Sequence, residues 1–139
     1  MRILHLSDTH NQHNFLNDLP EADLIIHSGD FSFAGTASEF RDFLKWFLDL
    51  NYQYKIFIGG NHDSFLEENS RKEIQSILPK NCHYLCHSGV TIENIKFWGV
   101  PMFVSEDLDG SYFEKIKKIP ADIDVLISHH PPLGILDLD

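Results

Sequence analysis

The sequence predicts an α/β fold built from a parallel sheet and a second sheet packed behind it. Apolar runs of strand length alternate with helix-like segments, and this order implies parallel strands joined by helical crossovers. Two short apolar runs on either side of Asn94 break the alternation and indicate an antiparallel hairpin. The chain has 139 residues without a linker, repeat or low-complexity segment, so we expect one domain over residues 1–139.

The first half of the chain alternates strands and helices. Its best-supported element is a helix over residues 37–50, because Thr36 and Glu39 form a capping-box pattern at its start. The apolar residues of this helix recur at helical spacing, which predicts one face packed on the sheet: Phe40, Phe43, Leu44, Phe47 and Leu48. The other predicted elements are strands over 2–6, 24–28 and Tyr54–Ile58 and a short helical stretch over Phe15–Leu19.

The second half contains the hairpin, two further helices and a returning strand. We expect the last helix to present its lysines to solvent and the last strand to be buried. The predicted elements are a helix over Ser70–Leu78 stopped by Pro79, hairpin strands over Val90–Glu93 and Ile95–Trp98, a charged helix near Ser111–Lys118 and a strand over Val125–Ser128.

The charge balance limits the classes of partner. A net charge of −10 argues against long nucleic acid, which normally binds a basic face. A small phosphorylated substrate remains compatible, because bound divalent cations reverse the field locally. No stretch approaches the ~20 apolar residues of a membrane helix. The N-terminal Met1-Arg2-Ile3 enters a strand directly, so we expect no membrane association and a cytoplasmic location.

The two cysteines, Cys82 and Cys86, are flanked by His83 and His87. This pattern suggests zinc, but the gap between the cysteines is not the usual spacing of a zinc site. On a strand, residues four apart lie ~13 Å from one another, which forbids binding of one ion. We therefore expect buried, reduced thiols.

Polar clusters follow four of the predicted strands directly. Because ligands bind at the carboxyl ends of strands in α/β sheets, we expect these clusters to converge at one edge. Their aspartate, histidine and asparagine side chains suit manganese, iron or zinc better than calcium, and predict a site for two metals. The clusters are Asp8-Thr9-His10, Gly29-Asp30, Gly60-Asn61-His62-Asp63 and Ser128-His129-His130-Pro131-Pro132.

Each cluster taken alone has a simpler interpretation. Asp30 and Asn61 are common turn residues, and a single histidine such as His10 or His129 is more often solvated or capping. His13 is either a substrate contact or an exposed loop residue, and the second is favoured. Four clusters in order, each directly after an apolar strand, favour the functional interpretation. His5 and His27 are interpreted as core or edge residues, and His130 is not assigned to a metal.

These motifs resemble those of the calcineurin-like metallophosphoesterases, a superfamily of dinuclear phosphatases and phosphodiesterases. The runs Ser7–His10, Gly60–Asp63 and Ser128–Gly134 look most like the small metallophosphoesterase-domain-containing subfamily. The resemblance extends from Ile3 to about Asp137. It implies an α/β/β/α sandwich of two mixed sheets flanked by helices.

The resemblance also implies a role for each site residue. Asp8 and His10 would bind the first divalent metal, and Asp30 would bridge both. Asn61 and His129 would bind the second. His62 would lie beside the ions as the catalytic general acid that protonates the leaving alkoxide. The implied activity is metal-dependent hydrolysis of a small phosphomonoester or phosphodiester.

The superfamily closes its site with a later Gly-His-x-His motif that gives one histidine to each metal. Nothing after His130 fits that motif, so the resemblance implies three protein ligands per ion and weaker binding of at least one ion. The chain is interpreted as a fragment, as completed by another chain, or as a reduced natural form. An uncovered sheet edge would favour a homo-oligomer. The rival function is a catalytically weakened metal- or nucleotide-binding module.

Overall fold

We analysed a computed structural model of the chain, which describes residues 1–135 and residue 137. The remaining positions of the predicted domain, 136, 138 and 139, lie outside the described residues. The described chain contains two sheets and flanking helices, which confirms the predicted α/β class. None of the helices in this part of the chain is both long and apolar enough to cross a bilayer.

The first sheet has four parallel strands in the order β1-β2-β3-β4. The central strands β2 and β3 are almost completely buried, whereas β1 lies at an edge and leaves Ile3 and His5 exposed. This sheet is therefore parallel throughout its described strands rather than mixed. The strands are β1 (Ile3–Leu6), β2 (Leu24–His27), β3 (Tyr54–Phe57) and β4 (Cys82–Tyr84).

The second sheet is mixed and contains β5 (Ser88–Ile92), β6 (Ile95–Val100) and β7 (Val125–Ser128). β5 and β6 form the predicted hairpin, and its turn residues Glu93 and Asn94 both have positive φ angles, as a tight hairpin turn requires. β7 pairs with β6 in parallel and lies at the sheet edge. The expectation of a buried last strand was therefore wrong for Leu126, which is exposed.

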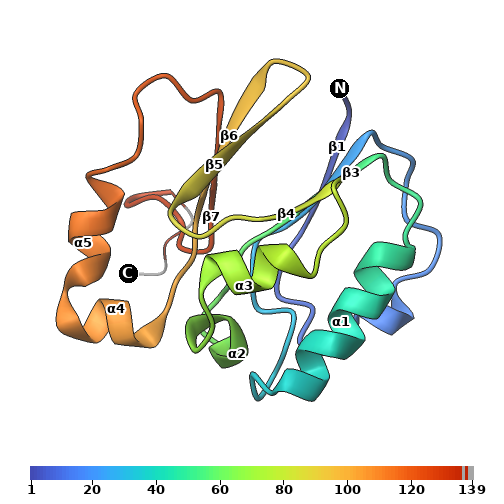
Figure 1. The fold of residues 1–139 in the computed structure, drawn as a ribbon, viewed down its shortest axis with the longest axis horizontal. Coiled ribbons are helices and arrows are strands. Elements are labelled where there is room, and N and C mark those ends of the chain that lie inside the picture. The colour runs from blue at the N-terminus through green and yellow to red at the C-terminus, as the bar shows by residue number, and fades with distance from the viewer. Residues whose placement is uncertain (136, 138–139) are drawn as a thin grey trace.

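Two apolar layers hold the elements together. One lies between the sheets and includes Ile26 and Ile56 from the first sheet and Phe97 and Ile127 from the second. The other packs the first sheet against helices on its outer face. Figure 1 shows α1 on the side of the first sheet, and α4 and α5 beyond the second sheet. The helices are α1 (Ala37–Asp49), α2 (Ser64–Glu67), α3 (Arg71–Ser76), α4 (Val104–Asp109) and α5 (Ser111–Ile116).

Helix α1 supplies most of the outer layer. Phe40, Phe43 and Phe47 are buried on the predicted face, and Phe43 stacks on Phe31, which follows β2. The capping box is present in full: the Thr36 side chain accepts from the Glu39 amide, and the Glu39 carboxylate accepts from the Thr36 amide. The helix is therefore fixed against the sheet next to the end of β2.

We expect Thr36→Ala to destabilise the protein by about 1 kcal/mol, because the Glu39 amide loses its acceptor. Urea unfolding at neutral pH measures this change. Thr36→Ser keeps the hydroxyl and should retain most of the stability. An equal loss in the serine variant would contradict the capping role.

Two local expectations were wrong, and two short helices were missed. The short helix is a 3₁₀ turn, η1 (His13–Phe15), because His13 is inserted into the core beside Phe43 and Trp46 and pins this segment. Helices α2 and α4 were not predicted, since each has only one or two turns and α4 ends at Gly110 in the left-handed conformation. Lys115 is not fully solvated but pairs with the buried Glu106.

Candidate metal centre

The strand ends bring the predicted ligands together. Asp8 follows β1, Asp30 follows β2, Asn61 and His62 follow β3, and His129 follows β7. Two groups of ligating atoms form, each with its atoms within 4.8 Å of one another. The groups are His10, Asp30 and His62, and Asp8, Asp30 and His129. Asp30 belongs to both groups. Asp8 is grouped with His129 rather than with His10, and His62 takes part in a group although the resemblance places it beside the ions.

Asp30 is the centre of this arrangement. It is 3% exposed, and its Oδ1 accepts from the His62 amide at 2.8 Å. Its Oδ2 lies 3.8 Å from His10 Nε2 and 3.6 Å from His129 Nε2. Two atoms that each lie about 2.1 Å from one ion are at most ~4.2 Å apart. Each of the two distances therefore fits a metal ion held jointly by Asp30 Oδ2 and that histidine.

Three histidines present an unprotonated nitrogen to the centre. His10 Nδ1 donates to the Ser32 carbonyl at 3.0 Å, His62 Nδ1 to the Phe33 carbonyl at 2.7 Å, and His129 Nδ1 to the Ser28 carbonyl at 2.9 Å. A carbonyl can only accept, so Nδ1 carries the proton in each neutral ring and Nε2 keeps its lone pair. This is the usual way in which a protein orients metal-binding histidines.

The contact between His129 and Asn61 also fits a cation. His129 Nε2 lies 3.1 Å from Asn61 Oδ1. Because Nδ1 of His129 carries the proton, these two atoms face each other with lone pairs and cannot share a hydrogen bond in the neutral state. Two ligands about 2.2 Å from one ion at a right angle lie ~3.1 Å apart. A shared cation therefore accounts for the approach of two acceptors.

The backbone of the ligand loops is strained. Asp8, His10 and Asp30 have φ angles of 54°, 41° and 56°, in the left-handed region that residues other than glycine rarely adopt. Such conformations cost about 1–3 kcal/mol each and are concentrated at functional sites. These backbone conformations direct all three side chains into the space between the strand ends.

Two glycines allow the loops to converge. A Cβ on Gly60 would lie 2.2 Å from Asp30 Oδ1 and 2.7 Å from His129 Cε1. A Cβ on Gly29 would lie 2.7 Å from the Gly60 nitrogen, and Gly29 has a φ of 104°. Side chains at either position would push Asp30 and His129 apart.

Comparison with known proteins identifies the family. The model of the family described as calcineurin-like phosphoesterase matches residues 1–138. The chain belongs to the calcineurin-like phosphoesterase family. The resemblance inferred from the motifs is thus confirmed. The family binds divalent metals, while metal binding by this chain and the number and identity of the ions stay predictions.

Curated relatives of the chain include longer proteins. The chain is 33% identical to metallophosphoesterase domain-containing protein 1 from Homo sapiens, over 98% of this chain and 50% of the human protein. It is 34% identical to the UPF0046 protein C25E10.12 from Caenorhabditis elegans, over 96% of this chain and 55% of that protein. The chain thus spans about half the length of these relatives. A solved structure of AQ665 from Aquifex aeolicus, a protein of unknown function, superimposes with a TM-score of 0.44 at 17% identity, over 97% of this chain and 83% of that one.

Asp63 is a residue of the candidate site whose role the sequence did not indicate. Its carboxylate is buried and accepts from four donors: the amides of Asp30, Ser32 and Gly60 and the Ser32 hydroxyl. Burial raises the pKa of Asp63, and the hydrogen bonds from Ser32 and Gly60 oppose this shift. The carboxylate therefore joins the loops after β2 and β3 and positions Asp30. The only signal in the sequence was an acidic residue directly after His62.

His27 joins the loops after β1 and β2 in the same way. Its Nδ1 accepts from the Gly29 amide at 3.3 Å, so its Nε2 carries the proton and donates to Thr9 Oγ1 at 3.0 Å. Thr9 stands between Asp8 and His10, and Gly29 precedes Asp30. Burial, followed by the charges of neighbouring histidines, lowers the pKa of His27 to about 3. The ring is therefore neutral in the folded protein.

The depressed pKa of His27 predicts a loss of stability in acid. Below pH ~6.5 the His27 ring is protonated in the unfolded chain but stays neutral in the folded chain, and this difference persists down to about pH 3. We expect a loss of roughly 3 kcal/mol between pH 6.5 and pH 4 in metal-free protein. Urea unfolding over this range measures it. His27→Phe should be less stable at pH 7 but flatter in its pH dependence, and an unchanged slope would contradict this assignment.

Two other sequence expectations were tested by the geometry. His13 is completely buried and its Nε2 bonds to Asp42 Oδ2 at 2.9 Å, so it is neither an exposed loop residue nor placed to contact a substrate. Cys82 is buried and Cys86 is half-buried, and both are reduced. Neither cysteine belongs to a metal-binding group among the described residues.

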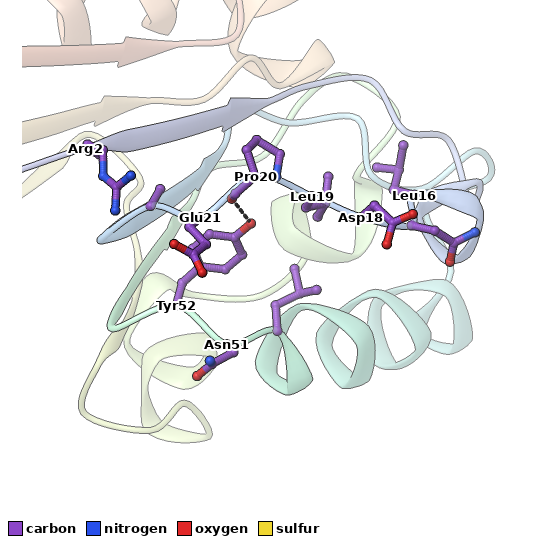
Figure 2. A pocket seen from close by; sticks show the side chains of 11 residues that line it. Arg2, Leu16, Asp18, Leu19, Pro20, Glu21, Asn51 and Tyr52 are labelled. Carbon is purple, nitrogen blue, oxygen red and sulfur yellow. Dashed lines mark hydrogen bonds between the residues drawn. The ribbon is translucent and has the colours of Figure 1, made fainter.

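One groove in the described part of the chain lies away from the candidate metal centre. It has a volume of about 590 Å³ and is lined by residues near the start of β1, before β2 and after α1. Figure 2 shows it with Tyr52 donating to the Pro20 carbonyl at 2.8 Å. None of the predicted ligands lines it, since these follow the opposite ends of the strands. A smaller hollow of about 370 Å³ adjoins Asp8 and His10.

Proposed function

We propose that this chain hydrolyses small phosphoesters at a dinuclear metal centre. Asp8, His10 and Asp30 would hold one divalent ion, and Asp30, Asn61 and His129 the other. The single observation that carries the proposal is that His10 and His129 donate from Nδ1 to main-chain carbonyls while their Nε2 atoms lie 3.8 and 3.6 Å from Asp30 Oδ2.

The donor types favour manganese, iron or zinc as the two ions. When bound, two divalent cations would neutralise the phosphoryl oxygens and lower the pKa of a water molecule. The protein's own part is to hold the ions with a buried carboxylate where the strand-end loops approach each other closely. Asp63 and His27 keep these loops in register.

His62 is proposed as the general acid. Its protonated ring would donate from Nδ1 to the Phe33 carbonyl and offer a second proton at Nε2 to the leaving oxygen. As a water oxygen bonds to phosphorus, the ester P–O bond breaks and its electron pair goes to the leaving oxygen. That oxygen takes the Nε2 proton, and the proton lost by the water restores the imidazolium through solvent.

No lysine or arginine among the described residues forms an ion pair with Asp8 or Asp30.

The rival candidate is a metal- or nucleotide-binding module with weakened catalysis. Both candidates use the same ligands, so turnover separates them. The test is hydrolysis of bis(p-nitrophenyl) phosphate by chelator-treated protein before and after addition of Mn²⁺. Mn²⁺-dependent turnover supports the phosphoesterase. Tight Mn²⁺ binding without turnover would establish the module.

We propose that the partner of the chain is a small phosphorylated substrate and that the chain does not bind long nucleic acid, in agreement with the net charge of −10. Self-association is also proposed, because the edge strands β1 and β7 expose the apolar Ile3 and Leu126. We expect a dimer or larger species in small-angle scattering. A monodisperse monomer at micromolar to millimolar concentration would contradict self-association without affecting the proposed chemistry.

A further inference from the structure

Phe33 is an exposed aromatic residue at the rim of the metal centre. It is 67% exposed, whereas Phe31, two residues earlier, is buried against Phe43. The Phe33 ring lies 5.7 Å from the His62 ring at a tilt of 35° and 6.3 Å from the His10 ring at 78°. One part of its surface therefore touches the candidate site, and the rest is open to a ligand.

The position of Phe33 is fixed by the main chain. The amides of Phe33 and Ala34 both donate to Glu39 Oε1, at 3.1 and 3.0 Å, and the Phe33 carbonyl accepts from His62 Nδ1. Although burial opposes it, hydrogen bonds from Ala34, Asn11 and Thr36 lower the pKa of Glu39 to about 2, so this anchor is anionic at neutral pH. Helix α1, through its capping box, thus holds the exposed ring beside His62.

We propose that Phe33 forms one wall of a leaving-group subsite and that the site prefers phosphoesters of flat, aromatic alcohols. This inference rests on the proposed function. If His62 protonates the leaving oxygen, the substituent on that oxygen extends past the His62 ring, and the Phe33 ring presents an exposed apolar surface next to it. A flat ring can lie against the Phe33 ring in an offset or edge-to-face arrangement, which a saturated ring of similar size matches less well.

The test compares dibenzyl phosphate with bis(cyclohexylmethyl) phosphate in the Mn²⁺-loaded full chain. Both diesters are symmetric and release primary alcohols, so they differ mainly in the flatness of the ring. We expect wild type to favour the benzyl diester by about 3- to 10-fold in kcat/KM. The same preference is expected in the Kd of benzyl phosphate over cyclohexylmethyl phosphate, measured by calorimetry.

Substitutions test whether the Phe33 ring causes the preference for benzyl over cyclohexylmethyl esters. Phe33→Leu keeps an apolar side chain and the main-chain bond to His62, and should reduce both ratios to about 1. Phe33→Tyr should retain them. Phe113→Leu, which alters an exposed phenylalanine on α5, should leave both ratios unchanged.

The outcomes distinguish a failure of the proposed phosphoesterase activity from a failure of the proposed Phe33 subsite. If wild type binds both monoesters but hydrolyses neither diester, the phosphoesterase activity fails, and the Kd ratio still tests the subsite. If hydrolysis is present but wild type shows no preference, or Phe33→Leu keeps it, the Phe33 subsite is contradicted while the activity stands.

Discussion

Asp30→Asn is expected to reduce Mn²⁺-dependent phosphodiester hydrolysis by about 10³-fold or more. Asp30 Oδ2 lies between His10 and His129, and its negative charge is the one that both proposed ions would share. Asparagine has nearly the same shape, and its oxygen can still accept from the His62 amide. The variant therefore removes the charge with little change in packing, and equilibrium dialysis should find weaker binding of at least one Mn²⁺.

Two controls separate a loss of metal binding from misfolding. The metal-free variant should unfold no more easily than metal-free wild type, because it removes a buried charge beside the carboxylate of Asp63. Asp122→Asn alters an exposed aspartate that pairs with Lys96 before β7, and should leave hydrolysis unchanged. If Asp30→Asn retained full activity, the dinuclear centre would be wrong.

His62→Gln is expected to reduce hydrolysis by about 10²–10⁴-fold for esters of simple alcohols. Their alkoxides need a proton as they leave, and His62 Nε2 is the group proposed to supply it. For p-nitrophenyl esters the leaving group is stable as an anion, so the loss should be much smaller. Comparison of kcat for the two ester classes measures the contribution of the acid.

The contrast between substrates also distinguishes two roles of His62. One of the ligating groups includes His62 with His10 and Asp30, so this histidine could instead bind metal. In that case His62→Gln would slow both ester classes equally and weaken Mn²⁺ binding. His130→Gln serves as the matched control, since His130 contacts Tyr112 and lies outside both ligating groups.

The sequence predicted the features that depend on local patterns. Helix α1 begins after Thr36 because its capping box lies within four residues, and its buried phenylalanines follow from their spacing. The ends of β1, β2, β3 and β7 were evident because each apolar run stops at a polar cluster. The convergence of these clusters followed from the general geometry of parallel sheets.

The features that the sequence did not reveal depend on partners far along the chain. His13 is buried only because Phe43 and Trp46 pack around it from α1. Asp63 positions Asp30 through main-chain amides, which leave no mark in the sequence. The proton positions of the histidines likewise depend on carbonyl groups of other loops, so the clearest evidence for metal binding needed the structure.

Anomalous diffraction from crystals soaked in Mn²⁺ tests the central claim most directly. We expect two manganese peaks about 3.5–4 Å apart on either side of Asp30. One peak should lie near Asp8 and His10 and the other near Asn61 and His129. A single peak, or two peaks that do not share Asp30, would contradict the dinuclear phosphoesterase centre.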